Sequence, residues 1–157
     1  MTVLKFSVLG RPAGKGSKRA LPIRRKDGSV GTAVIEQPMV RSWENAIREK
    51  AALVYCGELL DEPVQLTLLF YFKRPSGHFG KRGVRTTAPV LMTVAPDLDK
   101  LIRTVKDALQ GTIIRNDSRV FSLIASKRYG EPERVEVYLR TVSSTLSLDG
   151  DDADTEV

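Results

Sequence analysis

Residues 96–111 read PDLDKLIRTVKDALQG, and within this stretch the spacing of apolar residues becomes helical. From Leu98 onward they recur every three or four positions, which predicts an amphipathic helix. Gly111 is a natural stop for it. The apolar stripe consists of Leu98, Leu101, Ile102, Val105, Ala108 and Leu109.

The segments around this helix predict strands and one further helix. Alternation or helical spacing favours strands at 3–9, 64–73, 119–129 and 134–141, and a helix at 39–55. Residues 89–94 are expected to form a short extended piece. The turn residues at 130–133 predict that the last two strands form a hairpin. This order of elements indicates a mixed α/β (α+β) domain, with a single mixed sheet and two main helices packed on it.

Two polar segments rich in glycine and basic residues, 10–32 and 74–84, are predicted as loops. The run Gly14-Lys15-Gly16 invites comparison with a P-loop. However, its spacing from Gly10 is one residue short and no Ser or Thr follows the lysine, so nucleotide binding is rejected there. Two interpretations of the first loop remain open: a solvated connection, or a contact to a nucleic-acid backbone.

The composition is that of a single globular domain with a strong basic bias. The chain has 157 residues, of which 41% are hydrophobic and 28% charged, with a net charge of +6. We expect no membrane span or signal peptide. A single cysteine, Cys56, excludes an internal disulfide framework and fits the reducing cytoplasm.

The charge is unevenly distributed along the chain. Residues 149–157 hold five acids and no Lys or Arg, so the other 148 residues carry 25 basic and 14 acidic side chains, a balance of +11. This balance favours a polyanionic partner. We expect residues 1–142 to form the domain and residues 143–157 to be an acidic, disordered tail.

Three aspartates are candidates for a shared site. Asp97 and Asp99 share a face only if at least one of them precedes the helix, which Pro96 favours. Asp117 could join them from the segment after the helix. Crowded carboxylates repel one another unless a cation lies between them, and Mg²⁺ prefers such hard oxygen ligands. Alternatives remain open, because aspartates also cap helices and occur in turns.

Arg103 lies between Asp99 and Asp107 at spacings of four residues, on the face away from the apolar stripe. One interpretation is a ladder of surface ion pairs. The other is a cation that holds a scissile phosphate beside a metal site. The sequence pattern alone leaves both open.

Several short motifs together resemble the RusA family of Holliday-junction resolvases, which are phage and prophage endodeoxyribonucleases. They are APDLDKLIR at 95–103, KDAL at 106–109 with Gly111, NDSRV at 116–120, KRYG at 127–130, and GRP at 10–12 with Lys15. The resemblance covers most of residues 3–141.

The resemblance implies a small α/β homodimer that binds branched DNA and nicks two opposed strands of a four-way junction. Mg²⁺ would be the cofactor, with Mn²⁺ as a substitute, and the site would act in the cytoplasm of a bacterial host. By position Asp97, Asp99 and Asp117 match the metal-binding, catalytic aspartates, and Arg103 joins them as a catalytic residue. The basic residues expected to contact DNA are Lys15, Lys18, Arg19, Lys73, Arg74, Lys100, Lys106, Lys127 and Arg128.

The chain departs from the family at two positions. It has Arg103 where the family usually has a catalytic lysine, and Lys100 where the family has an asparagine. Arginine stays charged and cannot shuttle a proton, so it gives electrostatic support alone. Lys100 or Lys106 could supply the ammonium. Two alternatives therefore remain: a branched-DNA-binding protein with weak or no cleavage, and a nuclease acting on flaps or replication forks.

Overall fold

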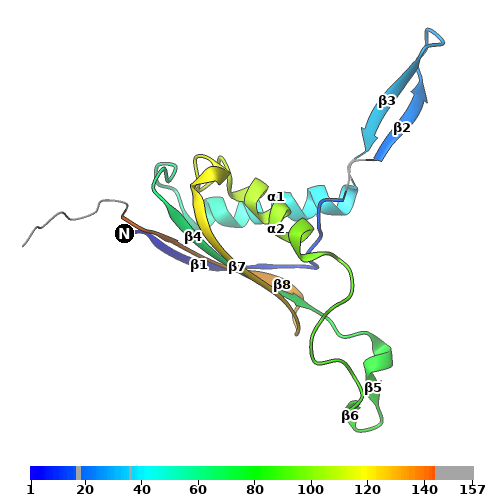
Figure 1. Cartoon of the computed structure of the whole chain (residues 1–157), viewed down its shortest axis with the longest axis vertical. Helices are drawn as coiled ribbons and strands as arrows, with labels where there is room; N and C mark the ends of the chain where they lie inside the picture. The colour runs from blue at the N-terminus through cyan, green and yellow to red at the C-terminus, as the bar shows by residue number, and fades with distance from the viewer. Residues whose placement is uncertain (17–18, 36, 144–157) are drawn as a thin grey trace, which may run out of the picture.

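The computed structural model describes residues 1–16, 19–35 and 37–143, with side chains described throughout these ranges except at 19–21 and 33–35. One four-stranded mixed sheet carries two helices on one face (Figure 1). Its strands are β1 (Val3–Leu9), β4 (Val64–Phe72), β7 (Val120–Tyr129) and β8 (Arg134–Thr141), and the helices are α1 (Pro38–Val54) and α2 (Leu98–Leu109). The predicted fold class is therefore confirmed. None of the helices in the described ranges is long and apolar enough to cross a bilayer.

The core lies between the sheet and the helices. Every second residue of β4, from Val64 to Phe72, is buried, as the alternation predicted. The helix α2 buries Leu101, Val105, Ala108 and Leu109 on the predicted stripe. After it Gly111 adopts a φ of 75° and donates its N–H to the Ile114 carbonyl, which ends the helix as predicted.

The strand order β1-β8-β4-β7 corrects the predicted hairpin. β4 lies between β7 and β8, pairing parallel with β7 and antiparallel with β8, so these two strands are not partners. The connection at 130–133 instead crosses the end of β4. A Cβ on Gly130 would lie 2.7 Å from the Tyr71 ring, so only glycine passes there without displacing the ring. The parallel pairing of β4 and β7 needs a long crossover connection, and α2 lies within it.

The first predicted loop contains a hairpin, which is a second correction. β2 (Arg19–Arg24) pairs antiparallel with β3 (Val30–Ile35), and this ribbon stands away from the sheet (Figure 1). Its turn uses Gly28 at a φ of 83°, and the Asp27 carboxylate accepts a hydrogen bond from the Ser29 N–H. An Asp-Gly pair is a strong hairpin signal, but the polar composition around it obscured the strands.

The connection from β4 to α2 has little regular structure. It contains η1 (Ser76–His78) and two short strands, β5 (Phe79–Gly80) and β6 (Gly83–Val84). Residues 89–94, expected to be extended, form no strand, and Met92 alone among them is buried in the core. The connection then reaches the first turn of α2. The proposed acidic tail falls almost wholly outside the described residues, so the domain boundary at 142 stays a prediction.

Candidate active site

The residue Asp97 stands at the N-terminal end of α2 in an extended conformation. Its side chain makes no capping hydrogen bond, so helix capping does not account for it. The carboxylate instead lies 2.8 Å from the Lys100 Nζ, and both side chains are substantially exposed. The hydrogen bond from Lys100, and then that lysine's charge, hold the pKa of Asp97 below its usual value. Asp99, in the first turn, is exposed and has no ion pair among the described residues.

The residue Asp117 opens the short helix η2 (Asp117–Arg119). The turn is stabilised by Asn116, whose side chain accepts the Ser118 N–H at 2.9 Å. The Asp117 carboxylate lies 3.4 Å from the Lys106 Nζ of α2. The structure therefore turns this aspartate toward α2 rather than into its own turn.

The three aspartates are not drawn into one coordination sphere. Within the described ranges, no group of three or more Asp, Glu, His and Cys side chains is close enough to hold a metal ion. Asp97 and Asp117 are each engaged by a lysine of α2 instead. Such exposed pairs contribute little to stability, so a divalent cation could displace them. The donor atoms are all carboxylate oxygens, which suits Mg²⁺.

The residue Arg103 is exposed on α2, and among the described residues no carboxylate pairs with it. The sequence allowed a ladder from Asp99 through Arg103 to Asp107, but Asp107 pairs with Lys15. The ladder does not form. The guanidinium is thus available to bind an anion.

The residue Lys15 links its own segment to both helices, α1 and α2. Its backbone N–H donates to the Lys100 carbonyl at 3.2 Å and to the Thr104 hydroxyl at 3.1 Å. Its Nζ lies 2.8 Å from Glu44 of α1 and 2.6 Å from Asp107 of α2. Burial lowers the pKa of Lys15, but hydrogen bonds and charge from Asp107 and Glu44 outweigh it and raise the pKa overall.

The glycine before Lys15 allows this close approach. A Cβ on Gly14 would lie 2.8 Å from the Lys100 Cβ, closer than real side chains come. The Gly14-Lys15 pair therefore lies directly against the first turns of α2. Sequence reasoning missed Glu44, whose place in the apolar stripe of α1 beside Trp43 and Ile47 was the available signal.

The residues Lys127 and Arg128 point in different directions from β7. The Lys127 Nζ donates to the carbonyls of Val94 at 2.7 Å and Pro96 at 2.9 Å, on the segment that enters α2. Arg128 is exposed, and its Nε donates to the Ser126 hydroxyl at 3.3 Å.

The second basic loop is anchored through Arg74. Its guanidinium lies 4.4 Å from the centre of the Tyr129 ring and donates to the Pro89 carbonyl at 2.8 Å. His78 contacts the same tyrosine edge-on at 5.4 Å. Lys106 and Lys100, both expected at the DNA, lie beside aspartates as described above. Lys18 falls outside the described residues, as does the side chain of Arg19.

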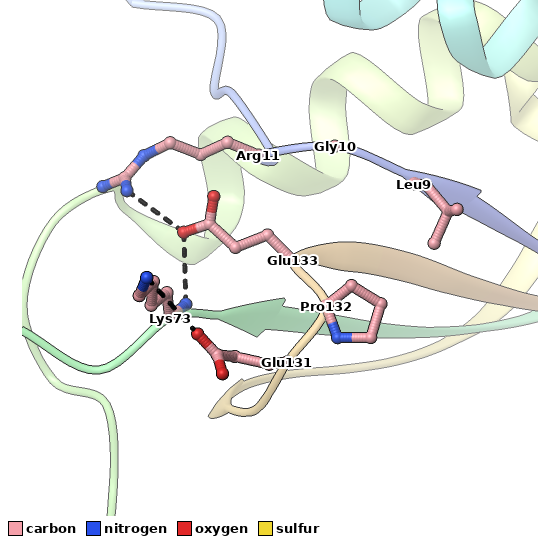
Figure 2. A pocket seen from close by; sticks show the side chains of 7 residues that line it. All are labelled: Leu9, Gly10, Arg11, Lys73, Glu131, Pro132 and Glu133. Carbon is pink, nitrogen blue, oxygen red and sulfur yellow. Dashed lines mark hydrogen bonds and ion pairs between the residues drawn. The ribbon is translucent and has the colours of Figure 1, made fainter.

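A shallow pocket of about 650 Å³ lies at the end of the sheet where β4 finishes (Figure 2). In it Glu133 accepts hydrogen bonds from the Arg11 guanidinium and the Lys73 backbone N–H, both at 3.1 Å. The Lys73 Nζ lies 3.6 Å from Glu131. Two basic and two acidic side chains thus largely offset one another here, and the three aspartates do not line the pocket.

Comparison with known proteins gives two findings. The family model described as endodeoxyribonuclease RusA matches residues 14–140 of this chain. YqaN, an uncharacterized protein of Bacillus subtilis strain 168, is 29% identical over 153 residues, which cover 92% of this chain and the whole of that protein. The family match covers both helices, the three aspartates, β4, β7 and all but the last residue of β8.

Proposed function

The chain belongs to the RusA endodeoxyribonuclease family, and from that premise we propose that it is a Mg²⁺-dependent nuclease that resolves four-way DNA junctions by paired, symmetric nicks. The observation that carries the proposal is how few structural contacts the three aspartate side chains make. The Asp97 side chain makes no capping hydrogen bond, Asp99 has no ion pair among the described residues, and Asp117 faces α2 rather than its own turn. Carboxylates that are unpaired or engaged only by surface ion pairs are suited to a cation.

In this proposal Asp97, Asp99 and Asp117 would hold the cation, for which Mn²⁺ can substitute. When bound, it would supply an activated water and neutralise charge on the phosphate and the leaving oxygen. Lys100 and Lys106 would then be released from their aspartates to face the DNA backbone. Arg103 would hold the scissile phosphate and stabilise the charge that develops on it.

The DNA would lie along the basic surface near the start of α2. Lys73 and Arg128 have exposed side chains and remain candidates for phosphate contacts. Lys15 and Lys127 are withdrawn from the proposed contact set, because their ammonium groups are bound to carboxylates and to backbone carbonyls respectively. The β2–β3 ribbon, which stands away from the sheet (Figure 1), adds Arg24 at the end of β2 and Arg25 in the turn that follows.

A homodimer would present two such sites to the two strands of a near-symmetric junction. One feature that supports pairing is the edge strand β7, which exposes Phe121 and Ile124 by 60% and 56%. Exposed apolar residues on an open strand edge favour association.

We propose that this nuclease acts in a bacterial cytoplasm and is of phage or prophage origin.

The direct test is cleavage of a labelled four-way junction with and without Mg²⁺, using the wild-type protein and Asp97→Asn. We expect symmetric nicks that need Mg²⁺, and an Asp97→Asn variant that binds the junction but does not cut it. Flap and fork substrates run in parallel would show whether the junction is the preferred structure. Normal cutting by Asp97→Asn would refute the metal assignment.

A second candidate function follows from Arg103. Because it replaces the usual lysine of the family, the chain could bind branched DNA while cutting it weakly or not at all. Tight junction binding without nicks in either Mg²⁺ or Mn²⁺ would favour this candidate.

A further inference from the structure

The segment that leads into α2 has little regular structure, and the Arg74 anchor described above reaches it at Pro89, several residues before Asp97. Between Phe72 and Leu98 the chain forms only η1 and the short β5–β6 pair, and Met92 is the one buried residue of the described segment 73–97. On its C-terminal side Asp97 is held by α2, because its carbonyl accepts the Leu101 N–H at 3.2 Å, so its remaining freedom comes from the connection that precedes it. A metal site built on Asp97 therefore requires a further constraint on the preceding backbone.

The constraint is found on β7. The Lys127 Nζ donates to the Val94 carbonyl at 2.7 Å and to the Pro96 carbonyl at 2.9 Å, immediately before Asp97. Hydrogen bonds from a charged donor are among the stronger ones in proteins. Lys127 lies opposite the buried Phe70 of β4, an interior strand of the main sheet, so the anchor is attached to the hydrogen-bonded sheet.

We propose that Lys127 is a positioning residue that fixes Asp97 for metal binding; the inference rests on the proposed function. It acts through the backbone rather than by touching DNA. The ammonium ties the two carbonyls that flank Ala95 to the sheet, and the carboxylate of the next residue is thereby held in one place. Groups that orient metal ligands in this way typically contribute 10–100-fold to affinity or activity.

The neighbouring residue Arg128 provides a matched control. Both residues are basic and both were expected to bind DNA. Successive residues of a strand point to opposite faces, so Arg128 lies on the face away from Lys127 and is exposed. Replacing either residue with Met removes one positive charge from the DNA-binding protein, but only replacement of Lys127 releases the segment before Asp97.

The sign of the effect separates positioning from charge. Lys127 places a positive charge near Asp97. If charge alone mattered, its removal would reduce repulsion and strengthen the binding of a divalent cation. If Lys127 positions the ligand, its removal weakens that binding.

The test measures Mn²⁺ binding to the DNA-free protein by electron paramagnetic resonance. It compares wild type, Lys127→Met, Lys127→Arg, Arg128→Met and Asp97→Asn. We expect Lys127→Met to bind about tenfold more weakly, Arg128→Met to bind like wild type, and Lys127→Arg to recover most of the loss. Hydrogen exchange of the peptide covering residues 93–99 should become faster in Lys127→Met alone, with the thermal midpoint of unfolding nearly unchanged.

Equal or tighter Mn²⁺ binding by Lys127→Met would overturn the inference. If that variant does not fold, Lys127→Gln, which keeps a donor group, is compared with Arg128→Met in the same way. Asp97→Asn separates the two levels of the account. If wild type does not bind Mn²⁺, or if Asp97→Asn binds it as well as wild type does, the proposed function fails. If Asp97→Asn loses Mn²⁺ binding but Lys127→Met binds like wild type, only the positioning role of Lys127 fails.

Discussion

The two ends of α2 carry aspartates in opposite circumstances. At the start of the helix Asp97 meets a single exposed lysine one turn away, and Asp99 meets no ion-pair partner within the described ranges. Near the end Asp107 is bound at 2.6 Å by Lys15, whose ammonium also binds the buried Glu44. The carboxylate of Asp107 therefore stabilises the fold, whereas those of Asp97 and Asp99 remain available to a ligand. The spacing of aspartates in the sequence does not distinguish these two roles.

The largest effect expected beyond the metal ligands themselves concerns Arg103. Arg103→Ala should slow junction cleavage about 100-fold, because a charge that stabilises the transition state is lost. Arg103→Lys should preserve cleavage or improve it. Rates under single-turnover conditions, with junction binding measured separately, provide the check. Cleavage at the wild-type rate by Arg103→Ala would return this residue to an ordinary surface position.

The opposite end of the helix should respond in stability. Lys15→Met keeps the apolar stem but leaves Asp107 and Glu44 without the ammonium, so we expect the free energy of unfolding to fall by about 1–3 kcal/mol. Urea unfolding measures this, with Lys81→Met in an exposed loop as the control. A variant as stable as wild type but weaker in DNA binding would show that Lys15 contacts DNA, as the sequence suggested.

The parts of the fold that depend on local pattern could be predicted from the sequence. The apolar stripe of α2 and the alternation of β4 each determine which face is buried, and both appear as expected. The separation of β7 from β8 could not be predicted, because a short turn containing Gly130 and Pro132 is compatible with a hairpin and with a crossing over another strand. What prevents the hairpin is β4, a strand distant in sequence that lies between β7 and β8 in the sheet.

The candidate site divides in the same way. The three aspartates were singled out from short local motifs, and their assignment as metal ligands stays a prediction. The partners of Lys15 and Lys127 could not, because Glu44, Asp107 and Pro96 come from distant segments that only the folded chain brings together. Lysines that the sequence does not distinguish therefore make different contacts in the folded chain: Lys15 binds carboxylates, and Lys127 binds backbone carbonyls.

The central claim is the proposal that Asp117 joins Asp97 and Asp99 around a divalent cation, in place of its ion pair with Lys106. The most direct measurement is a calorimetric titration of Mn²⁺ into wild type, Asp97→Asn and Asp117→Asn, with the exposed Glu62→Gln as the charge control. The account predicts that both aspartate variants bind at least about tenfold more weakly, as even supporting groups around metal sites cost that much, and that Glu62→Gln binds normally. Wild-type affinity in Asp117→Asn would contradict it.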